Sequence, residues 1–208
     1  MITATELLEL SPVIPVVVLD DLRQAVPVAE ALLLGGIPVL ELTLRTSVAL
    51  AAIEKVRAEV PEIMVGAGTV TTAEHARQAM ESGAGFLVTP GYTERVLDAA
   101  QATGLPLLPG ASTVSEAMRL AERGLTALKF FPAEASGGVG YLRSIAGPLP
   151  GLRFCPTGGI TEDTAPRYLK LSNVACVGGT WLTPGDALAG NDFSRIEMLA
   201  KAAAGLTR

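Results

Sequence analysis

One lysine of this chain lies in a segment where lysines are rarely found. Lys129 is one of four lysines, and it stands in the apolar run from Leu125 to Phe131, flanked by Gly124 and Pro132. Burying an ammonium group is costly unless it is paired or loses its proton, and a neutral lysine amine is a nucleophile toward carbonyl carbon. The segment therefore predicts Schiff-base chemistry. The alternative is an edge-strand lysine that extends its ammonium into water.

A carboxylic acid stands in a comparable setting in an earlier apolar segment. Strand alternation over residues 39–45 places Glu41, Thr43 and Arg45 on one face and three leucines on the other. If the leucines contact helices, Glu41 faces the interior, where burial favours the protonated acid and suits proton transfer. We therefore predict that Glu41 is the acid-base partner of Lys129. A purely structural ion pair with Lys129 or Arg45 is the alternative.

Other expected strand ends carry groups that suit a small anion. The planar guanidinium of Arg45 can bind a carboxylate or phosphate through two hydrogen bonds, and Thr69 offers a hydroxyl after a glycine-rich strand. The pairs Gly158-Gly159 and Gly178-Gly179 follow the last two predicted strands, where backbone amides often bind phosphate. Each signal is weak alone, but together they predict a phosphorylated carbonyl compound as ligand.

The elements that must position these residues follow from a regular alternation of apolar strands and helix-period segments. The predicted strands are residues 13–19, 38–43, 63–69, 85–89, 105–108, 127–131, 153–157 and 173–177. Their starts recur at about 20 to 26 residues, the length of one strand, one helix and two short loops. We predict an α/β fold, a (β/α)8 TIM barrel formed by residues 1–208 as a single domain, with an additional N-terminal helix over residues 3–10.

Helix boundaries are marked by two kinds of residue. Thr71 with Glu74, and Thr113 with Glu116, have the spacing of capping boxes, in which side chains satisfy the free amides of the first turn. Glycines follow the apolar helical patterns at residues 35–36, 83, 104 and 124, where they can adopt the left-handed conformation that ends a helix.

Composition excludes several classes of function. The net charge of −5, the pI near 5.0 and the scattered arginines argue against a nucleic-acid surface. Charged residues and Gly-Pro breaks interrupt the apolar stretches, so no membrane span is expected. The acidic first ten residues are unlike a signal peptide, which favours a cytoplasmic protein.

Metal and histidine chemistry is not expected either. Cys155 and Cys176 lie in apolar strand patterns without nearby ligands, so they are interpreted as small buried hydrophobes. His75 is the only histidine and falls in a helical pattern, where a solvated helix face is the simplest interpretation. The sequence therefore predicts neither a metal site nor a histidine-based triad.

Several linked motifs resemble the 2-keto-3-deoxy-6-phosphogluconate (KDPG) aldolase family of class I aldolases, nearly end to end. They are Pro12–Val16, Glu41–Thr46, Val65–Val70, Pro109–Thr113, Lys129–Glu134 and Arg153–Ile160. The resemblance implies reversible cleavage of KDPG to pyruvate and glyceraldehyde 3-phosphate, a reaction of the Entner-Doudoroff pathway. It implies that Lys129 forms the Schiff base with the C2 carbonyl and that Glu41 moves protons. Because the iminium is the electron sink, no metal or organic cofactor is expected.

The resemblance also implies a set of substrate-binding residues and a homotrimer. Arg45 and Thr69 would hold the pyruvyl carboxylate, Pro90 and Phe131 would line the pocket, and Thr157, Gly158, Gly159, Gly179 and Thr180 would surround the phosphate. Where better-known members have Gly-Gly-Ser-Trp, this chain has threonine at position 180, which keeps the hydroxyl and adds a methyl group.

Other functions use similar residues. Aldolases for 4-hydroxy-2-oxoglutarate or for the galactonate epimer of KDPG share the lysine chemistry. A phosphate-barrel isomerase or epimerase would use Lys129 only to pair with an anion and would form no iminium. A non-catalytic sugar-phosphate binding module would release no pyruvate.

Overall fold

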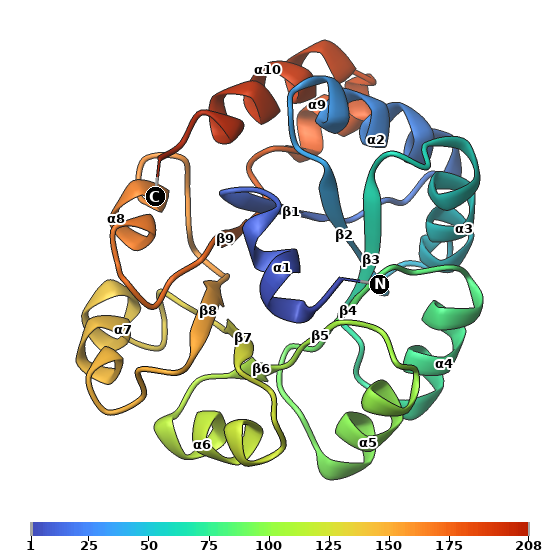
Figure 1. The fold of residues 1–208 in the computed structure, drawn as a ribbon. Coiled ribbons are helices and arrows are strands. Elements are labelled where there is room, and N and C mark those ends of the chain that lie inside the picture. Colours follow the sequence, from blue (N-terminus) through green and yellow to red (C-terminus); the bar gives the residue numbers. More distant parts are fainter. Residues whose placement is uncertain (1, 208) are drawn as a thin grey trace.

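The computed structural model describes residues 2–207, so the predicted domain limits at residues 1 and 208 lie outside the described range. Strands and helices alternate along most of the chain (Figure 1). The strands are β1 (Val13–Val17), β2 (Val39–Thr43), β3 (Met64–Gly68), β4 (Leu87–Val88), β5 (Leu107–Leu108), β6 (Gly110–Ala111), β7 (Ala127–Phe130), β8 (Arg153–Pro156) and β9 (Val177–Gly179). The helices are α1 (Ala4–Glu9), α2 (Ala25–Leu34), α3 (Ala49–Glu59), α4 (Ala73–Glu81), α5 (Glu94–Ala102), α6 (Val114–Glu122), α7 (Gly138–Ala146), α8 (Ala165–Leu169), α9 (Gly185–Gly190) and α10 (Phe193–Ala204), with a short 3-10 helix, η1, at Leu22–Gln24.

The strands pair in parallel and form an α/β fold around a curled sheet. One sheet has the order β5-β4-β3-β2-β1-β9, and a second has the order β6-β7-β8. Isolated parallel bridges join Phe154 to Val174 and Thr157 to Gly178, which connects β8 with the β9 segment. Figure 1 shows the strands around a common axis with most of the helices outside them. Parallel strands of this kind present their carboxyl ends on one side, where sites form.

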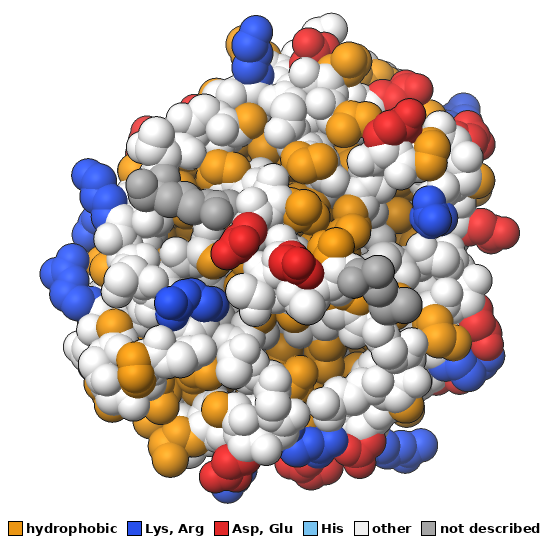
Figure 2. Space-filling view, viewed as in Figure 1, with side chains coloured by type: hydrophobic (Ala, Val, Ile, Leu, Met, Phe, Trp, Pro, Cys, Tyr) orange, Lys and Arg blue, Asp and Glu red, His pale blue; other side chains and the backbone are white. Residues whose placement is uncertain are grey.

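The interior follows from strands that are buried on both faces. Every residue of β1 and β2 is buried, which is typical of parallel sheets covered by helices. The helix α1 lies across the middle of the ring in Figure 1, with Leu7 and Leu8 fully buried, so the predicted additional N-terminal helix is confirmed. Figure 2, from the same side, shows hydrophobic side chains toward the middle of this face and most charged ones around its rim. Within residues 2–207, no helix is long and apolar enough to cross a membrane.

Most predicted helix boundaries agree with the structure. Thr113 and Glu116 form the predicted capping box at the start of α6. Gly36, Gly83, Gly104 and Gly124 all have positive φ, as predicted for residues that end helices. The prediction of a capping box at Thr71 was wrong, because the hydroxyl of Thr72 accepts the His75 amide and begins α4 one residue later.

The observed strands are mostly shorter than predicted, and two predicted segments differ in kind. The eighth predicted strand, residues 173–177, is mostly irregular, and β9 begins only at Val177. Asn173 donates its side-chain amide to Leu142 O, and Val174 N closes a turn onto Leu171 O, which draws this segment away from a ladder. The fifth predicted strand, residues 105–108, is followed at once by a further short strand, β6. Pro109 separates β5 from β6, because proline has no N–H to donate to a ladder.

The close contact of α2 with α10 gives a stability prediction. A Cβ added at Gly35 would lie 2.4 Å from Ala200 Cβ and 2.7 Å from Glu197 O. Gly35→Ala is therefore expected to lower the free energy of unfolding by about 1–3 kcal/mol through overpacking. Gly147 is a suitable control, because it also ends a helix with right-handed φ and a Cβ there would meet nothing within 4 Å.

Denaturant unfolding of both variants checks this prediction. Gly147→Ala is expected to be neutral or to stabilise by up to about 1 kcal/mol, since alanine restricts the unfolded chain. Equal unfolding free energies for the two variants would contradict the packing argument.

Candidate active site

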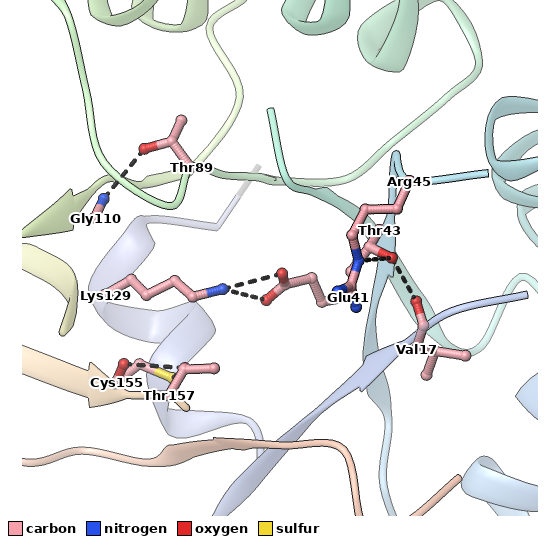
Figure 3. Close-up of polar contacts among 9 residues, drawn as sticks. All are labelled: Val17, Glu41, Thr43, Arg45, Thr89, Gly110, Lys129, Cys155 and Thr157. Carbon is pink, nitrogen blue, oxygen red and sulfur yellow. Dashed lines mark hydrogen bonds and ion pairs between the residues drawn. The ribbon is translucent and has the colours of Figure 1, made fainter. Parts of the chain in front are cut away.

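Lys129 and Glu41 meet inside the ring of strands although 88 residues separate them (Figure 3). Lys129 Nζ donates to Glu41 Oε1 at 3.2 Å and lies 3.5 Å from Oε2. The two residues are only 6% and 3% exposed, so the interpretation of Lys129 as a lysine that extends into water does not hold. The predicted partner contact is present, and a proton can pass directly between the amine and the carboxylate.

The strand β7 fixes the direction of the lysine. In register with Lys129 are Gly110 on β6 and Cys155 on β8, both small residues. On the opposite face of β7, Phe130 stacks on Tyr141 with ring centroids 5.3 Å apart and packs edge-on to Phe154. Because this aromatic cluster anchors one face of β7 in the core, strand alternation directs Lys129 into the ring.

An aromatic ring also stands beside the amine. Lys129 Nζ lies 5.5 Å from the centroid of the Phe131 ring, a distance at which a cation is attracted by the ring face. Phe131 therefore lies beside the amine, on the cavity that Lys129 also lines.

The carboxylate of Glu41 occupies space that a neighbouring glycine leaves open. A Cβ at Gly68 on β3 would lie 2.0 Å from Glu41 Oε1 and 2.5 Å from its Cγ. No side chain other than hydrogen is compatible with this position of Glu41. Gly68 was seen in the sequence only as part of a glycine-rich strand end, because its contact with β2 depends on the register of the sheet.

Arg45 is anchored through a threonine that the sequence placed on the right face but did not assign to the site. Thr43 donates its hydroxyl to Val17 O at 3.1 Å, and Arg45 Nε donates to Thr43 Oγ1 at 3.3 Å (Figure 3). This use of Nε leaves the terminal guanidinium nitrogens for an anion. Strand alternation was the signal that could have added Thr43 to the predicted set.

Thr69 has a backbone conformation that is rare for a β-branched residue. Its φ is +59°, in the left-handed region. Hydrogen bonds on either side hold it there, from Leu44 N to Gly68 O at 2.8 Å and from Val70 N to Val88 O at 3.1 Å. Local strain of this kind is found where a site requires one fixed geometry.

The loop after β8 has backbone amides available for an anion. Gly158 and Gly159 have φ of 105° and 80°, and neither N–H has a hydrogen-bond acceptor within residues 2–207. Consecutive free amides of this kind bind anions such as phosphate. The loop thus has the geometry that its predicted role requires.

In β9 the structure places Gly178, rather than Gly179, against this region. A Cβ at Gly178 would lie 2.1 Å from Thr157 Oγ1, whereas one at Gly179 would meet the Trp181 ring. Gly179 does not line the cavity, so its assignment to the phosphate stays a prediction.

One cavity of about 180 Å³ brings the predicted residues together. The predicted residues that line it are Glu41, Arg45, Thr69, Pro90, Lys129, Phe131, Thr157, Gly158, Gly159 and Thr180. Four residues that were not predicted also line it, namely Val16, Thr43, Ile160 and Gly178.

A larger cavity of about 470 Å³ adjoins this one at Val16 and Thr180. That cavity contains Asp20 and Asp21 and no lysine or arginine, so it suits an anion poorly. In the described part of the chain, no cluster of three or more His, Cys, Asp or Glu side chains could hold a metal ion.

This arrangement, a buried lysine paired with a carboxylate beside anion-binding groups, defines a site for nucleophilic chemistry on an anionic carbonyl compound. Residues 4–199 match the family model of the KDPG and KHG aldolases. The chain therefore belongs to the KDPG and KHG aldolase family.

Individual relatives are similar over nearly their whole length. The chain is 51% identical to the 2-dehydro-3-deoxy-phosphogluconate aldolase of Dickeya dadantii, covering 99% of this chain and 97% of that protein. It is 50% identical to the KHG/KDPG aldolase of Escherichia coli K12, covering 97% and 94%. A crystal structure of the KDPG aldolase of Legionella pneumophila, with pyruvate captured as a covalent carbinolamine, matches with a TM-score of 0.96 and 44% identity, covering 98% of this chain and 99% of that one.

The contact between Gly68 and Glu41 gives a prediction for the site. Gly68→Ala is expected to displace the Glu41 carboxylate and to lower any turnover that needs the Lys129–Glu41 pair by about 100-fold, since a shift of about 1 Å can cost that much. Gly91→Ala is the control, because a Cβ there would meet nothing within 4 Å. Steady-state kinetics of both variants, together with a crystal structure of Gly68→Ala, measure the effect. Normal turnover in a folded Gly68→Ala variant would contradict the argument.

Proposed function

We propose that this chain is a class I aldolase that reversibly cleaves KDPG to pyruvate and glyceraldehyde 3-phosphate, as a step of the Entner-Doudoroff pathway. The observation that carries the proposal is the buried contact between Lys129 Nζ and Glu41 at 3.2 Å. This pair opens onto the cavity that also contains Arg45 and the Gly158-Gly159 loop. Membership of the KDPG and KHG aldolase family supports the same reaction.

The first steps form the iminium. Lys129 transfers a proton to Glu41, and the Nζ lone pair attacks C2 of the keto acid. Glu41 then moves a proton from nitrogen to the C2 oxygen, which gives the carbinolamine. A second proton transfer to that oxygen releases water and leaves a C=N⁺ bond. Close contact between the amine and the carboxylate makes the first of these transfers direct.

Cleavage uses the iminium as the electron sink. Glu41 removes the proton of the C4 hydroxyl, the C3–C4 bond breaks, and its electron pair forms an enamine while the nitrogen becomes neutral. Glyceraldehyde 3-phosphate leaves with the new C4 carbonyl. Glu41 returns a proton to C3, and water hydrolyses the resulting pyruvyl iminium to pyruvate and free Lys129. The cycle needs only this chain's own groups and water.

The two charged ends of the substrate are assigned to opposite sides of the amine. Arg45 and Thr69 would bind the pyruvyl carboxylate, with Arg45 held through its Nε by Thr43. Pro90 and Phe131 would line the pocket between them. The phosphate would be bound by the residues after β8 and β9, namely Thr157, Gly158, Gly159, Gly179 and Thr180.

The name of one relative supports a second candidate substrate. The Escherichia coli relative bears the name KHG/KDPG aldolase, and it is 50% identical to this chain. We propose 4-hydroxy-2-oxoglutarate, a keto acid without phosphate, as the alternative substrate of the same lysine chemistry. The ratio of kcat/KM for the two keto acids decides which is preferred.

Substitution of Lys129 tests the reaction class. Lys129→Ala is expected to lower pyruvate release from KDPG by about 1,000-fold or more, because no other group replaces a covalent nucleophile. Lys129→Arg should be equally inactive, since a guanidinium cannot form the iminium. A coupled assay for pyruvate measures both, with Lys55→Ala as a surface-lysine control.

The activities of these two variants also distinguish the Schiff-base mechanism from an isomerase that forms no iminium. An isomerase that uses Lys129 only as a positive charge would keep substantial activity as Lys129→Arg, and a folded Lys129→Ala variant with near-normal cleavage would exclude the Schiff base.

We also propose how the chain is organised. The two sheets would form one closed (β/α)8 barrel, supported by the bridge from Thr157 to Gly178 and by the hydrogen bond from Lys129 N to Pro109 O at 2.9 Å. Residues 1–208 would form one domain, since one contiguous core cluster extends over most of the described residues. A cytoplasmic homotrimer is proposed from the family resemblance, and sedimentation equilibrium determines the number of subunits.

A further inference from the structure

A buried tyrosine lies beneath the loop proposed to bind phosphate, and the mechanism above does not use it. Tyr168 on α8 is fully buried, and its hydroxyl donates to Glu134 Oε1 at 2.5 Å. A hydrogen bond to a carboxylate at this distance is among the stronger ones in proteins. Burial, together with this hydrogen bond, raises the pKa of Tyr168 far above its usual value, so the hydroxyl remains a donor at neutral pH.

The first residue of α7 lies close to the hydroxyl and to the Glu134 carboxylate. A Cβ at Gly138, where φ is +56°, would lie 3.0 Å from Tyr168 Oη and 3.6 Å from Glu134 Oε2. The start of α7 therefore closes over the pair. Glu134 is an exposed residue overall, but one of its carboxylate oxygens is held by a buried partner.

The stem of Glu134 contacts the loop directly. A Cβ at Gly159 would lie 2.8 Å from Glu134 Cγ and 2.9 Å from its Cβ. The backbone of the same segment is bonded to the loop, because Ala133 N donates to Thr157 O at 2.8 Å and Glu134 N donates to Gly158 O at 3.1 Å. Residues 133–134 thus form the support on which the Gly158-Gly159 loop lies.

The charge of Glu134 explains why its position matters. A carboxylate that could turn freely beside Gly159 would repel a phosphate dianion bound to the same loop. The hydrogen bond from Tyr168 fixes the carboxylate, and the methylene groups remain packed against the loop. Without the hydroxyl, the side chain gains rotamers, the loop loses part of its support and the carboxylate can approach the anion.

We propose that Tyr168 and Glu134 are positioning residues for the phosphate end of the substrate. Tyr168 fixes Glu134, and Glu134 holds the Gly158-Gly159 loop in the conformation that presents its two amides. This inference rests on the proposed function, because it takes a phosphorylated keto acid as substrate. Neither residue needs to touch the reacting atoms, so the effect is confined to substrates that carry phosphate.

The test compares KDPG with its unphosphorylated analogue, 2-keto-3-deoxygluconate, as substrates of the full chain. Tyr168→Phe is expected to raise KM for KDPG about 10-fold, the effect of losing a hydrogen bond to a charged group, with kcat changed less than about 2-fold. Glu134→Ala should also raise KM, because the loop loses the side chain that packs against Gly159. Kinetics on the unphosphorylated analogue should remain those of the wild type for both variants.

Conservative and matched variants separate positioning from general damage. Glu134→Gln keeps an oxygen that accepts from Tyr168 and should restore KM for KDPG to near the wild-type value. Tyr92→Phe removes another half-buried tyrosine hydroxyl, which donates to Glu116 O, and should leave the kinetics of both substrates unchanged. Thermal unfolding verifies that each variant is folded, and the exposed position of Glu134 makes Glu134→Ala the safer variant if Tyr168→Phe is unstable.

Three results would overturn the inference in distinguishable ways. An unchanged KM for KDPG in folded Tyr168→Phe and Glu134→Ala would remove the positioning role and leave the aldolase function intact. An equal loss on both substrates would show a general structural role instead. A wild-type protein that does not prefer KDPG over its unphosphorylated analogue would refute phosphate recognition itself, and the inference with it.

Discussion

The buried contact between Lys129 and Glu41 is the constraint on which the rest of the structure depends. Either charge alone would cost several kcal/mol to bury, and the attraction between them offsets this cost only if the geometry is good. The structure meets this requirement at 3.2 Å by placing the two groups on β7 and β2, each a strand with hydrogen-bonded neighbours on both sides. A pair so enclosed can exchange a proton without reorganising water, which is the condition that imine chemistry at neutral pH imposes.

Glycines shape the site as much as the residues with larger side chains do. At Gly68, Gly178 and Gly159 an added Cβ would collide with Glu41, Thr157 and Glu134 respectively. Each of these three side chains therefore occupies space that only a glycine at the facing position leaves open. Tight packing of this kind holds the groups in place before substrate arrives, which is the main way in which a protein stabilises developing charge. The strained backbone at Thr69 is a further sign that geometry at this end of the ring is fixed.

The sequence predicted the reactive pair because charged residues in apolar strands are conspicuous, and strand alternation directed both to the same interior. It also predicted most strands and the additional N-terminal helix. Contacts between distant segments were beyond it: the space that Gly68 leaves for Glu41 depends on the register of β2 and β3, and the Tyr168–Glu134 hydrogen bond depends on how α8 packs. The irregular segment before β9 was missed because its apolar residues pack without forming a ladder, which periodicity alone does not reveal.

We expect Lys129 Nζ to form a covalent imine with a keto acid. Incubating the protein with pyruvate and sodium borohydride, and then locating the reduced adduct by peptide mass spectrometry, tests this expectation. The expected result is a single adduct on Lys129, with none on the exposed or half-buried lysines 55, 170 and 201. A folded protein that gives no adduct, or gives one on another lysine, would contradict it.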